Sequence, residues 1–478
     1  MRTFYWGAIL FSLATVVWFS EGNGRPDQHL ISAASGAAQE SSRSDSRIQQ
    51  GGVRRPAISY QRVIELLARE KPTVDRAAVA IDREWHPGTA AMLIEILSLA
   101  RNPHTFNTTL SLLKRKTGQN FGRDLQAWYH WVWTTAYDPH PEYAAFKAKL
   151  YSRIDNRFRA YFQDADDARI RLDEIRWGGV RRDGIPPLKN PKMLAASDAS
   201  YLADSDVVFG VNLNGDARCY PKRILAWHEM FKDTVGSISV CGVYCTLCGS
   251  LIIYETDIDD VHYELGTSGF LYRSNKLMYD HATESFWSTL QGEPVVGPLV
   301  GKGIQLQQRH VVTTTWGEWK KKNPKTTVLS LDTGHFRDYR EGVAYRDYFA
   351  TDELMFDVPE LDDRLKNKDE VLAFRDSANQ LAISADFLQA NPVYHSKLSD
   401  SAFVILTDQS GANRVYEVKG VQFVSWDQES VAIDDQGRKW DVSAEALRNS
   451  DSILKRLPAH RVFWFAWNSQ YPNSRLIQ

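Results

Sequence analysis

The chain has 478 residues, of which 43% are apolar and 24% charged, and its formal net charge is −2 at pH 7. This ordinary globular composition excludes a wholly disordered or collagen-like protein. The near-zero net charge argues against a nucleic-acid partner, which would need a concentrated basic surface. Aromatic residues are numerous, with 15 Trp, 20 Tyr and 21 Phe, whereas there are only 4 Cys.

Residues 1–22 are typical of a secretory signal peptide. Arg2 supplies a positive charge, residues 4–19 form an apolar run, and small residues near Gly22 suit cleavage. This run is short for a bilayer span, so we expect a mature chain that is secreted, lumenal or periplasmic, with no membrane span beyond this segment. Residues 23–56 are rich in small and polar residues without periodicity, which predicts a disordered linker.

Residues 57–165 are predicted to form a helical domain. Apolar residues recur there at helical spacing in several short segments, for example at Val74, Ala77, Ala78 and Ile81. Several short amphipathic helices without strands indicate a small array of packed helices. We expect this array to serve in packing or docking.

After a segment rich in Gly and Pro, the pattern changes to short β-type runs separated by turn residues. The fold class is therefore predicted to be α+β, with an N-terminal helical domain followed by a strand-rich domain pair. We place the first half of this pair at residues 166–368 and the second half at residues 369–478.

The two halves carry a weak internal duplication. Trp316 and Trp319 in the first half match Trp464 and Trp467 in the second, and each pair is followed by a proline five residues later. If the duplication is real, the second half has lost every cysteine of the first. Any cysteine chemistry is then confined to the first half.

Several motifs occur in a fixed order around a Cys-x-x-Cys sequence. They are Trp177-Gly178-Gly179, Tyr220-Pro221, Trp227-His228-Glu229, Tyr244-Cys245-Thr246-Leu247-Cys248-Gly249, Ser274-Asn275, Met278-Tyr279-Asp280, Ser285-Phe286-Trp287, Arg337-Asp338-Tyr339 and Phe463-Trp464-Phe465-Ala466-Trp467. With these motifs the chain resembles the domain-of-unknown-function 3179 family. It departs from the family pattern at Thr246, where the family has Pro, and at His281, where the family has Arg. The resemblance implies no established reaction.

Cys245 and Cys248 have a spacing that permits a local disulfide, a redox dithiol or half of a metal site. The segment 250–255 reads as a strand, which argues against a thioredoxin fold, where a helix follows the cysteines. No second Cys-x-x-Cys exists, so a zinc site of paired motifs is excluded.

His228, on a predicted short helix, is the expected third metal ligand. Two thiolates and an imidazole suit Zn or Cu better than hard cations. The alternative is a histidine that is hydrogen-bonded within the core. No Gly-rich phosphate loop is present, so no nucleotide cofactor is expected.

A set of polar and aromatic residues is predicted to line the rim of a cleft. These residues are Glu229, Ser268, Asn275, Tyr279, Asp280, Ser285 and Trp287. Asp280 and Glu284 are four residues apart, which is the spacing of an ordinary solvated helix face. The alternative interpretation is that they are paired carboxylates for acid–base chemistry. The run Lys320-Lys321-Lys322 is predicted to be a solvated surface.

We therefore expect an exported protein with a Zn or Cu site formed by Cys245, Cys248 and His228. The alternatives are a non-catalytic secreted binding protein, with an aromatic cleft and a structural disulfide, or a dithiol oxidoreductase. The partner is an unidentified small molecule, glycan or protein. Catalytic residues, and whether the protein is an enzyme, are left open.

Overall fold

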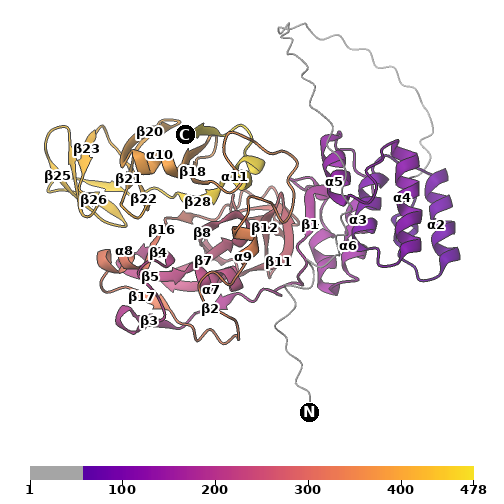
Figure 1. Ribbon diagram of the computed structural model, residues 1–478, viewed down its shortest axis with the longest axis horizontal. Coiled ribbons are helices and arrows are strands. Elements are labelled where there is room, and N and C mark those ends of the chain that lie inside the picture. Colours follow the sequence, from indigo (N-terminus) through magenta and orange to yellow (C-terminus); the bar gives the residue numbers. More distant parts are fainter. Residues whose placement is uncertain (1–56) are drawn as a thin grey trace, which may run out of the picture. The chain divides into compact units, whose positions relative to one another are not determined.

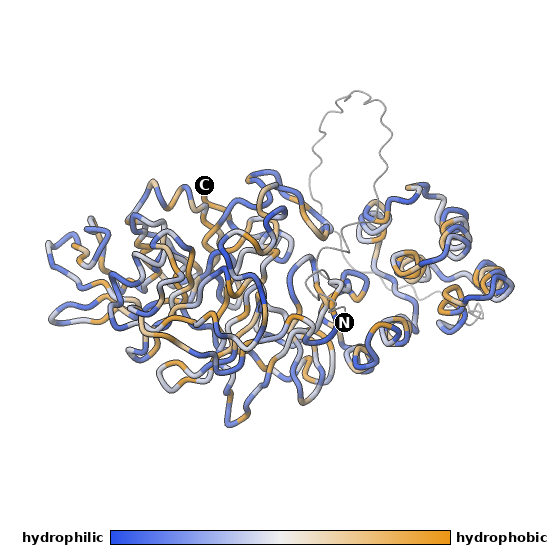
Figure 2. Tube along the Cα trace, turned by 60° about the horizontal axis from the view of Figure 1, so that its bottom comes forward, coloured by the Kyte–Doolittle hydropathy of each residue, from blue (hydrophilic) through white to orange (hydrophobic). Residues whose placement is uncertain are grey.

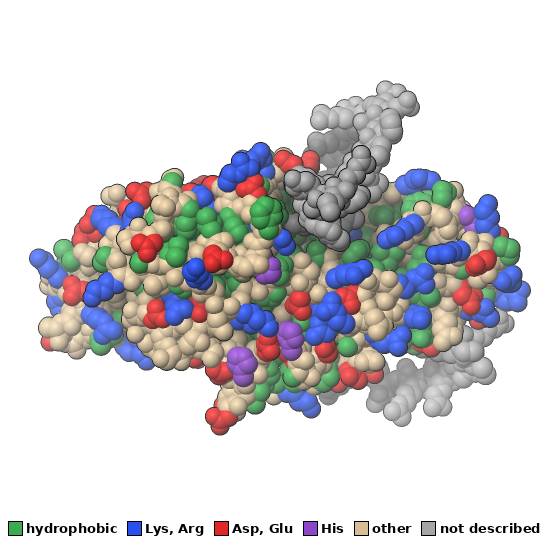
Figure 3. Space-filling view, turned by 90° about the horizontal axis from the view of Figure 1, so that it is seen from below, with side chains coloured by type: hydrophobic (Ala, Val, Ile, Leu, Met, Phe, Trp, Pro, Cys, Tyr) green, Lys and Arg blue, Asp and Glu red, His purple; other side chains and the backbone are tan. Residues whose placement is uncertain are grey.

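The structure is a computed structural model that describes residues 57–478, and Ala57–Gln478 forms one compact unit. The predicted signal peptide (1–22) and linker (23–56) lie outside the described residues. Within the described part of the chain, no helix has the length and apolar character needed to cross a membrane. Figure 3 shows Lys and Arg side chains interspersed with Asp and Glu on one face, which matches the near-zero net charge.

Six α-helices come first along the described chain (Figure 1). They are α1 (Tyr60–Glu65), α2 (Lys71–Arg83), α3 (Thr89–Leu99), α4 (Pro103–Thr117), α5 (Leu125–Thr134) and α6 (Tyr143–Tyr151), followed by the 3-10 helices η1 (Asn156–Phe162) and η2 (Leu172–Glu174). Asn102 caps α4 by accepting a hydrogen bond from the backbone N–H of Thr105 at 2.8 Å. Gly118 ends the same helix in the left-handed region, with φ of 71°. Figure 2 shows hydrophobic residues at the centre of this helical array and hydrophilic residues on its outer turns.

The helices pack against a sheet whose strands are in the order β1-β11-β12-β13-β14. The strands are β1 (Ile175–Trp177), β11 (Leu265–Tyr272), β12 (Asn275–Asp280), β13 (Phe286–Ser288) and β14 (Glu293–Val296). Phe270 and Phe286 of this sheet pack with Phe158, Tyr161 and Phe162 of η1. The helical array and this sheet therefore share one hydrophobic core.

Two sheets with the same topology support the predicted duplication. The first contains β16-β4-β5-β17, with β3 at its edge, and the second contains β28-β18-β19-β29. In each, the first two neighbouring pairs are antiparallel and the last pair is parallel. The first set is β3 (Met193–Ala195), β4 (Val207–Leu213), β5 (Asp216–Pro221), β16 (Val312–Thr315) and β17 (Thr327–Leu329), with helices α7 (Lys222–His228) and α8 (Trp316–Lys322). The second set is β18 (Glu370–Arg375), β19 (Gln380–Ser384), β28 (His460–Phe463) and β29 (Arg475–Ile477), with helices α10 (Ala385–Ala390) and α11 (Trp464–Gln470).

The Trp-x-x-Trp repeat marks equivalent helices, α8 and α11. In both helices the indole N–H of the second Trp donates to a hydroxyl seven residues later: Trp319 to Thr326 at 2.9 Å, and Trp467 to Ser474 at 2.8 Å. This shared contact fixes each helix against the strand that follows it.

The remaining strands also repeat between the halves. An antiparallel meander, β6-β7-β8, matches the meander β20-β21-β22. These strands are β6 (Met230–Val235), β7 (Ile238–Cys245), β8 (Ser250–Glu255), β20 (Val393–Leu398), β21 (Ser401–Thr407) and β22 (Asn413–Glu417), with β2 (Leu188–Lys189) and β15 (Gln308–Arg309) flanking the first meander. A final meander of β23 (Phe423–Trp426), β24 (Val431–Asp434), β25 (Lys439–Val442), β26 (Ala446–Arg448) and β27 (Ile453–Lys455) is the counterpart of the sheet under the helices. The small hairpin of β9 (Asp257–Ile258) and β10 (Val261–His262), the helix α9 (Arg346–Phe349) and the 3-10 helices η3 (Ala196–Asp198) and η4 (Thr246–Cys248) complete the described elements.

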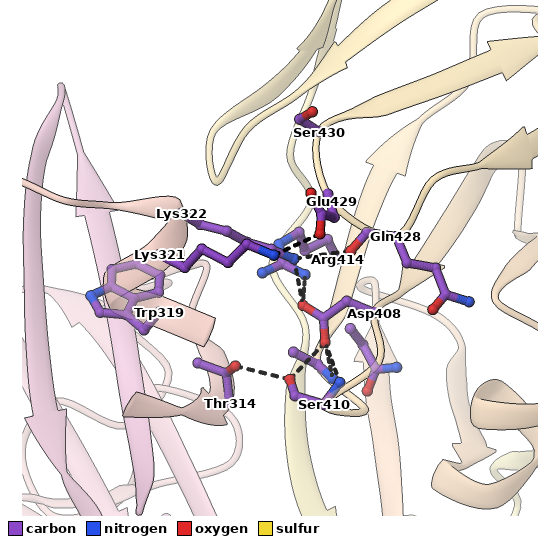
Figure 4. Close-up of polar contacts among 12 residues, drawn as sticks. Thr314, Trp319, Lys321, Lys322, Asp408, Ser410, Arg414, Gln428, Glu429 and Ser430 are labelled. Atoms are coloured by element: carbon purple, nitrogen blue, oxygen red, sulfur yellow. Dashed lines mark hydrogen bonds and ion pairs between the residues drawn. The ribbon is translucent and has the colours of Figure 1, made fainter. Parts of the chain in front are cut away.

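One polar junction ties the first half to the second (Figure 4). Asp408, in the β21–β22 turn, accepts hydrogen bonds at 2.8 Å from both Lys322 of α8 and Arg414 of β22. Ser410 of the same turn lies 3.0 Å from the hydroxyl of Thr314 in β16. The Lys322 side chain is only 16% exposed, so the predicted solvated lysine surface is wrong at this position. We call these contacts the Asp408 junction.

Candidate functional site

The two cysteines of the Cys-x-x-Cys sequence lie at a hairpin turn. Strand β7 ends at Cys245, the 3-10 turn η4 (Thr246–Cys248) follows, and β8 begins at Ser250. The sulfurs lie at disulfide distance, with the Cα atoms 5.2 Å apart. Cys245 is 2% exposed and Cys248 is fully buried. A strand therefore follows the pair, as the sequence predicts.

Gly249 closes this turn for two reasons. Its φ of 63° lies in the left-handed region, which glycine adopts without a steric penalty. A Cβ atom at this position would also lie 2.8 Å from the ring of Phe463 in the second half. The cysteine turn is thus packed against β28 and the start of α11, and it shares a hydrophobic cluster with them.

Asn275 is the polar side chain in contact with the cysteine pair. Its Nδ2 donates to Sγ of Cys248 at 3.1 Å, and the carbonyl oxygen of Ser274 lies 3.7 Å from the same sulfur. Asn275 directly follows a tight turn formed by Arg273 and Ser274, whose φ angles are 47° and 62°. Positive φ at both residues is the conformation of a two-residue hairpin turn, and Asp259 and Asp260 adopt it in the β9–β10 hairpin as well.

The Arg273–Ser274 turn is held from both sides. The Arg273 guanidinium donates to the Glu174 carboxylate at 2.5 Å and to the carbonyl of Ser469 in α11 at 2.5 Å. The side chain of Gln470 donates to the carbonyl of Tyr272 at 3.2 Å. These contacts place Asn275 against Cys248. We call the cysteine turn, Asn275 and these anchoring contacts the cysteine junction.

Three hydroxyl groups close in sequence to the cysteine pair or to Asn275 are buried. The Oγ atoms of Ser250 and Ser274 and the Oγ1 atom of Thr246 have no hydrogen-bond partner among the described residues. Each of these residues is at most 3% exposed. Burying an unsatisfied hydroxyl is unfavourable, and the helical array contains others at Thr89, Thr105 and Thr109.

A segment between the halves covers the cysteine turn. Tyr348 of α9 donates its hydroxyl to the carbonyl of Leu247 at 2.7 Å. Tyr348 and Val358 belong to the same hydrophobic cluster as Cys245 and Cys248. Access to the sulfurs therefore requires displacement of this segment.

His228 is a hydrogen-bonded core residue. Its Nδ1 lies 2.9 Å from the carbonyl of Pro186, and its Nε2 lies 2.6 Å from the hydroxyl of Tyr339. A carbonyl only accepts, so Nδ1 carries the proton and Nε2 accepts from Tyr339. Burial lowers the pKa of His228 to about 4, so the ring is neutral at pH 7.

The predicted Zn or Cu site at Cys245, Cys248 and His228 is not supported by this geometry. Both ring nitrogens of His228 are engaged by protein groups, so neither is free to coordinate an ion. Among residues 57–478, no group of three or more His, Cys, Asp or Glu side chains is arranged to hold a metal.

Glu229 forms a buried ion pair beside the cysteine turn. Its carboxylate lies 2.6 Å from Nζ of Lys276, and its carbonyl accepts from the N–H of Tyr244 at 2.9 Å. Burial lowers the pKa of Lys276, and the neighbouring Glu229 opposes that effect. Glu229 has a φ of 55° and ends helix α7 in the left-handed region, where its N–H donates to the carbonyl of Leu225.

The other residues predicted to line a cleft are buried and have structural partners. Asp280 accepts from the indole N–H of Trp287 at 3.1 Å and from both the N–H and the hydroxyl of Thr283, at 2.6 and 2.7 Å. Asp434 in the second half makes the same contact with Trp440 at 3.0 Å. This Asp–Trp pair therefore organises a hairpin in both halves.

Tyr279, Ser268 and Ser285 are likewise engaged within the structure. Tyr279 donates to Asp183 at 2.6 Å, Ser268 donates to the carbonyl of Leu277 at 2.6 Å, and Ser285 lies 2.8 Å from Thr283. All three are buried. A surface pocket of about 210 Å³ lies elsewhere, lined by Lys189, Lys232, His262 and Glu264 among others.

Sequence reasoning missed the contacts that assemble the site. Arg273, Lys276, Tyr348, Phe463 and Gln470 were not among the predicted residues, although each contacts a member of the site. The only sequence signals were that Ser274-Asn275 and Phe463-Trp464 lie within motifs of the resemblance. Their meeting depends on tertiary structure, which local spacing does not encode.

Comparison with known proteins agrees with the sequence resemblance. Residues 182–474, more than half of the chain, match the family model described as Protein of unknown function (DUF3179). No curated protein and no solved structure matches the chain. The matched span contains His228, both cysteines and both Trp-x-x-Trp helices. The chain therefore belongs to the DUF3179 family of proteins of unknown function.

Proposed function

We propose that the chain is an exported protein whose Cys245–Cys248 pair is a reversible dithiol–disulfide couple. The pair would exchange electrons with a small thiol or with the dithiol of another protein. A thiolate attacks one sulfur, the disulfide breaks, and the second sulfur leaves as a thiolate. A second thiol then releases the mixed disulfide, so two thiols are oxidised for each disulfide reduced.

The cysteine-free hairpin of the second half carries this proposal. Cys245 pairs with Ser250 across the β7–β8 turn, and Thr407 pairs with Asn413 across the equivalent β21–β22 turn. Asp408 closes that second turn by accepting from the N–H groups of Ser410 and Ala412 at 3.0 and 3.1 Å. The fold thus forms this hairpin without a disulfide.

Loop entropy also argues against a purely stabilising disulfide. A cross-link between residues three apart restrains very little of the unfolded chain. In the chain-entropy account it contributes about 2 kcal/mol, compared with almost 5 kcal/mol for a 100-residue loop. A disulfide placed to stabilise the fold would gain more by joining distant segments.

A redox titration tests the proposal. The purified chain is equilibrated in dithiothreitol or glutathione buffers, quenched with acid, unfolded, alkylated, and weighed as intact protein. We expect two further alkylations to appear together on reduction, with a two-electron slope of about 30 mV per tenfold change and a midpoint above about −300 mV. A pair that stays oxidised below that potential would be a structural disulfide, which would contradict the proposal.

Two other cysteines provide an internal control. Cys219 and Cys241 are free and buried, and burial raises the pKa of Cys219 well above its usual range and that of Cys241 to about 12. Because neither forms a disulfide, we expect both to be alkylated at every potential once the chain is unfolded, as a constant background. One Zn or Cu ion retained per chain by the reduced protein would instead favour the metal hypothesis.

Export is tested separately, by N-terminal sequencing of the mature protein. We expect the mature chain to begin near Asn23 and to be found in a secreted, lumenal or periplasmic fraction. Recovery of the chain from the cytosol with Met1 intact would contradict export.

A further inference from the structure

We infer that Asn275 stabilises Cys248 as the leaving thiolate, so that Cys245 is the sulfur attacked by the incoming thiol. This inference rests on the proposed dithiol–disulfide exchange. It identifies the residue that determines which sulfur is attacked and which sulfur leaves. Asn275 contacts the sulfur that must accept negative charge.

The two sulfurs have different surroundings. Nδ2 of Asn275 donates to Sγ of Cys248 at 3.1 Å. Among the hydrogen bonds of the described residues, none reaches Sγ of Cys245. An N–H group binds an anionic sulfur more strongly than a neutral disulfide sulfur, so this contact strengthens as charge develops on Cys248. It therefore lowers the barrier for cleavage in that direction more than it stabilises the disulfide.

Cys248 also has a partner once it is protonated. The carbonyl oxygen of Ser274 lies 3.7 Å from its sulfur, a distance at which the thiol can donate. The thiolate thus accepts from Asn275 and the thiol donates to Ser274. Cys248 therefore has a hydrogen-bond partner both as a thiolate and as a thiol, and the β11–β12 turn need not rearrange between the two.

The position of Asn275 is fixed by contacts from outside its own hairpin. Arg273 and Ser274 both have positive φ, a conformation required by a two-residue turn of this hand. Neither residue is glycine, and contacts from outside the hairpin restrain the turn. Glu174 and Ser469, which bind Arg273 from two different parts of the chain, supply that restraint.

The reaction then follows one order. The incoming thiolate forms a bond to Sγ of Cys245, the Cys245–Cys248 bond breaks, and its electron pair goes to Cys248. A second thiolate then attacks the other sulfur of the mixed disulfide, the one contributed by the first incoming thiol. This attack frees Cys245 as a thiolate. Both cysteine thiolates take protons from water, and the products are a dithiol and one disulfide of the incoming thiol.

Trapping the intermediate tests which sulfur is attacked. The oxidised full chain is mixed with glutathione, quenched with an alkylating agent, digested, and sequenced by fragmentation mass spectrometry. We expect glutathione on Cys245 and the alkyl group on Cys248. Glutathione on Cys248, or equally on both, would overturn the inference.

Two substitutions test the role of Asn275. Asn275→Asp preserves shape but replaces the donor with a negative charge, and Asn275→Leu removes the donor alone. We expect glutathione to reduce the disulfide about tenfold more slowly in Asn275→Leu, and more slowly still in Asn275→Asp. As a control, Asn413→Asp makes the same change at a buried asparagine of the second half. We expect glutathione to reduce the Cys245–Cys248 disulfide of this variant at the wild-type rate.

The outcomes separate this inference from the proposed function. Unchanged reduction rates in both Asn275 variants would overturn the role of Asn275, even if the pair titrates reversibly. A pair that does not titrate at all would overturn the proposed function itself. Circular dichroism of each variant confirms that a slower rate belongs to folded protein, and Asn275→Asp retains the test if Asn275→Leu does not fold.

Discussion

The Asp408 junction and the cysteine junction occupy equivalent places in the two halves and use different chemistry. Each is built on the turn of a three-stranded meander that packs against the β–α unit of the other half. In one, Asp408 binds Lys322 of α8 (Figure 4). In the other, Cys245 and Cys248 pack on Phe463 and α11.

The equivalence extends to the last residue of helices α8 and α11, which in each case contacts the other half of the chain. Lys322 of α8 donates to the carbonyl of Gln428 in the β23–β24 turn at 3.3 Å. Gln470 occupies the same position in α11 and donates to the carbonyl of Tyr272, at the start of the β11–β12 turn, at 3.2 Å. The Asp408 junction therefore has a carboxylate at its meander turn, whereas the cysteine junction has a pair of sulfurs at the equivalent turn. The difference shows that the backbone does not require cysteines at this turn.

The largest expected effect comes from removing the charge of the Asp408 junction. Asp408→Asn leaves Lys322 and Arg414 without their carboxylate in a buried setting. We expect the free energy of unfolding to fall by about 3–5 kcal/mol, because an unpaired buried charge is strongly unfavourable. Urea unfolding at pH 7 measures the loss, and a change below about 1 kcal/mol would show that the junction does not hold the halves.

The same junction predicts a pH dependence. Burial raises the pKa of Asp408, but Arg414 and Lys322 outweigh that effect and lower it to about 2. Because this pKa is lower in the folded chain than in the unfolded chain, the stabilisation is present above about pH 4 and is lost as the pH falls towards about 2. Asp408→Asn should flatten this part of the profile of unfolding free energy against pH, whereas removal of the cysteines should leave it unchanged.

Removing the cysteine pair should cost less. Changing both Cys245 and Cys248 to Ala should lower the free energy of unfolding by about 2 kcal/mol, because the cross-linked loop is short. Urea unfolding of the double variant, beside the wild type with and without reductant, measures this difference. A loss as large as that of Asp408→Asn would mean that the disulfide is primarily structural.

The duplicated Trp contacts should have matching, smaller effects. Thr326→Val and Ser474→Ala each remove the acceptor of an indole N–H, from Trp319 and Trp467 respectively. Because a buried donor is left unpaired, we expect each to cost about 1–2 kcal/mol. Parallel unfolding curves for the two variants measure both effects, and strongly unequal losses would show that the two helices are not equivalent in energy.

The smallest expected effect lies at the edge of the Asp408 junction. Lys321 and Glu429 form an ion pair in which both side chains are more than half exposed. Glu429→Gln should leave the free energy of unfolding almost unchanged, because water screens the pair. This variant is the exposed control for Asp408→Asn, and a comparable loss from it would remove the distinction between buried and exposed pairs.

Local sequence patterns predicted the parts of the fold that depend on near neighbours. Helical periodicity around Val74 and Ile81 predicted α2, and the Trp-x-x-Trp repeat predicted the duplication that the strand order supports. The apolar run after Cys248 predicted β8. Each of these signals lies within one element or one turn, where spacing alone determines which side chains share a face.

Side-chain partners across the fold were not predictable in this way. Tyr339, which occupies Nε2 of His228, lies 111 residues away in sequence. Lys322 was predicted to be solvated because its neighbours are lysines, yet its partner Asp408 is 86 residues away. Asp280 and Trp287 suggested a cleft, and only the matching pair in the second half identifies their structural role. Long-range pairing of this kind is set by topology, which a single sequence does not display.

The reciprocal junctions make the two halves resemble the protomers of a twofold dimer. In such an assembly one surface meets its own copy, so every contact occurs twice with the partners exchanged. Joining the copies into one chain makes their association intramolecular and independent of protein concentration. It also frees the two contacts to diverge, which no identical pair of subunits can do. A single cysteine pair can then exist on one side of a pseudo-symmetric interface while a carboxylate occupies the other.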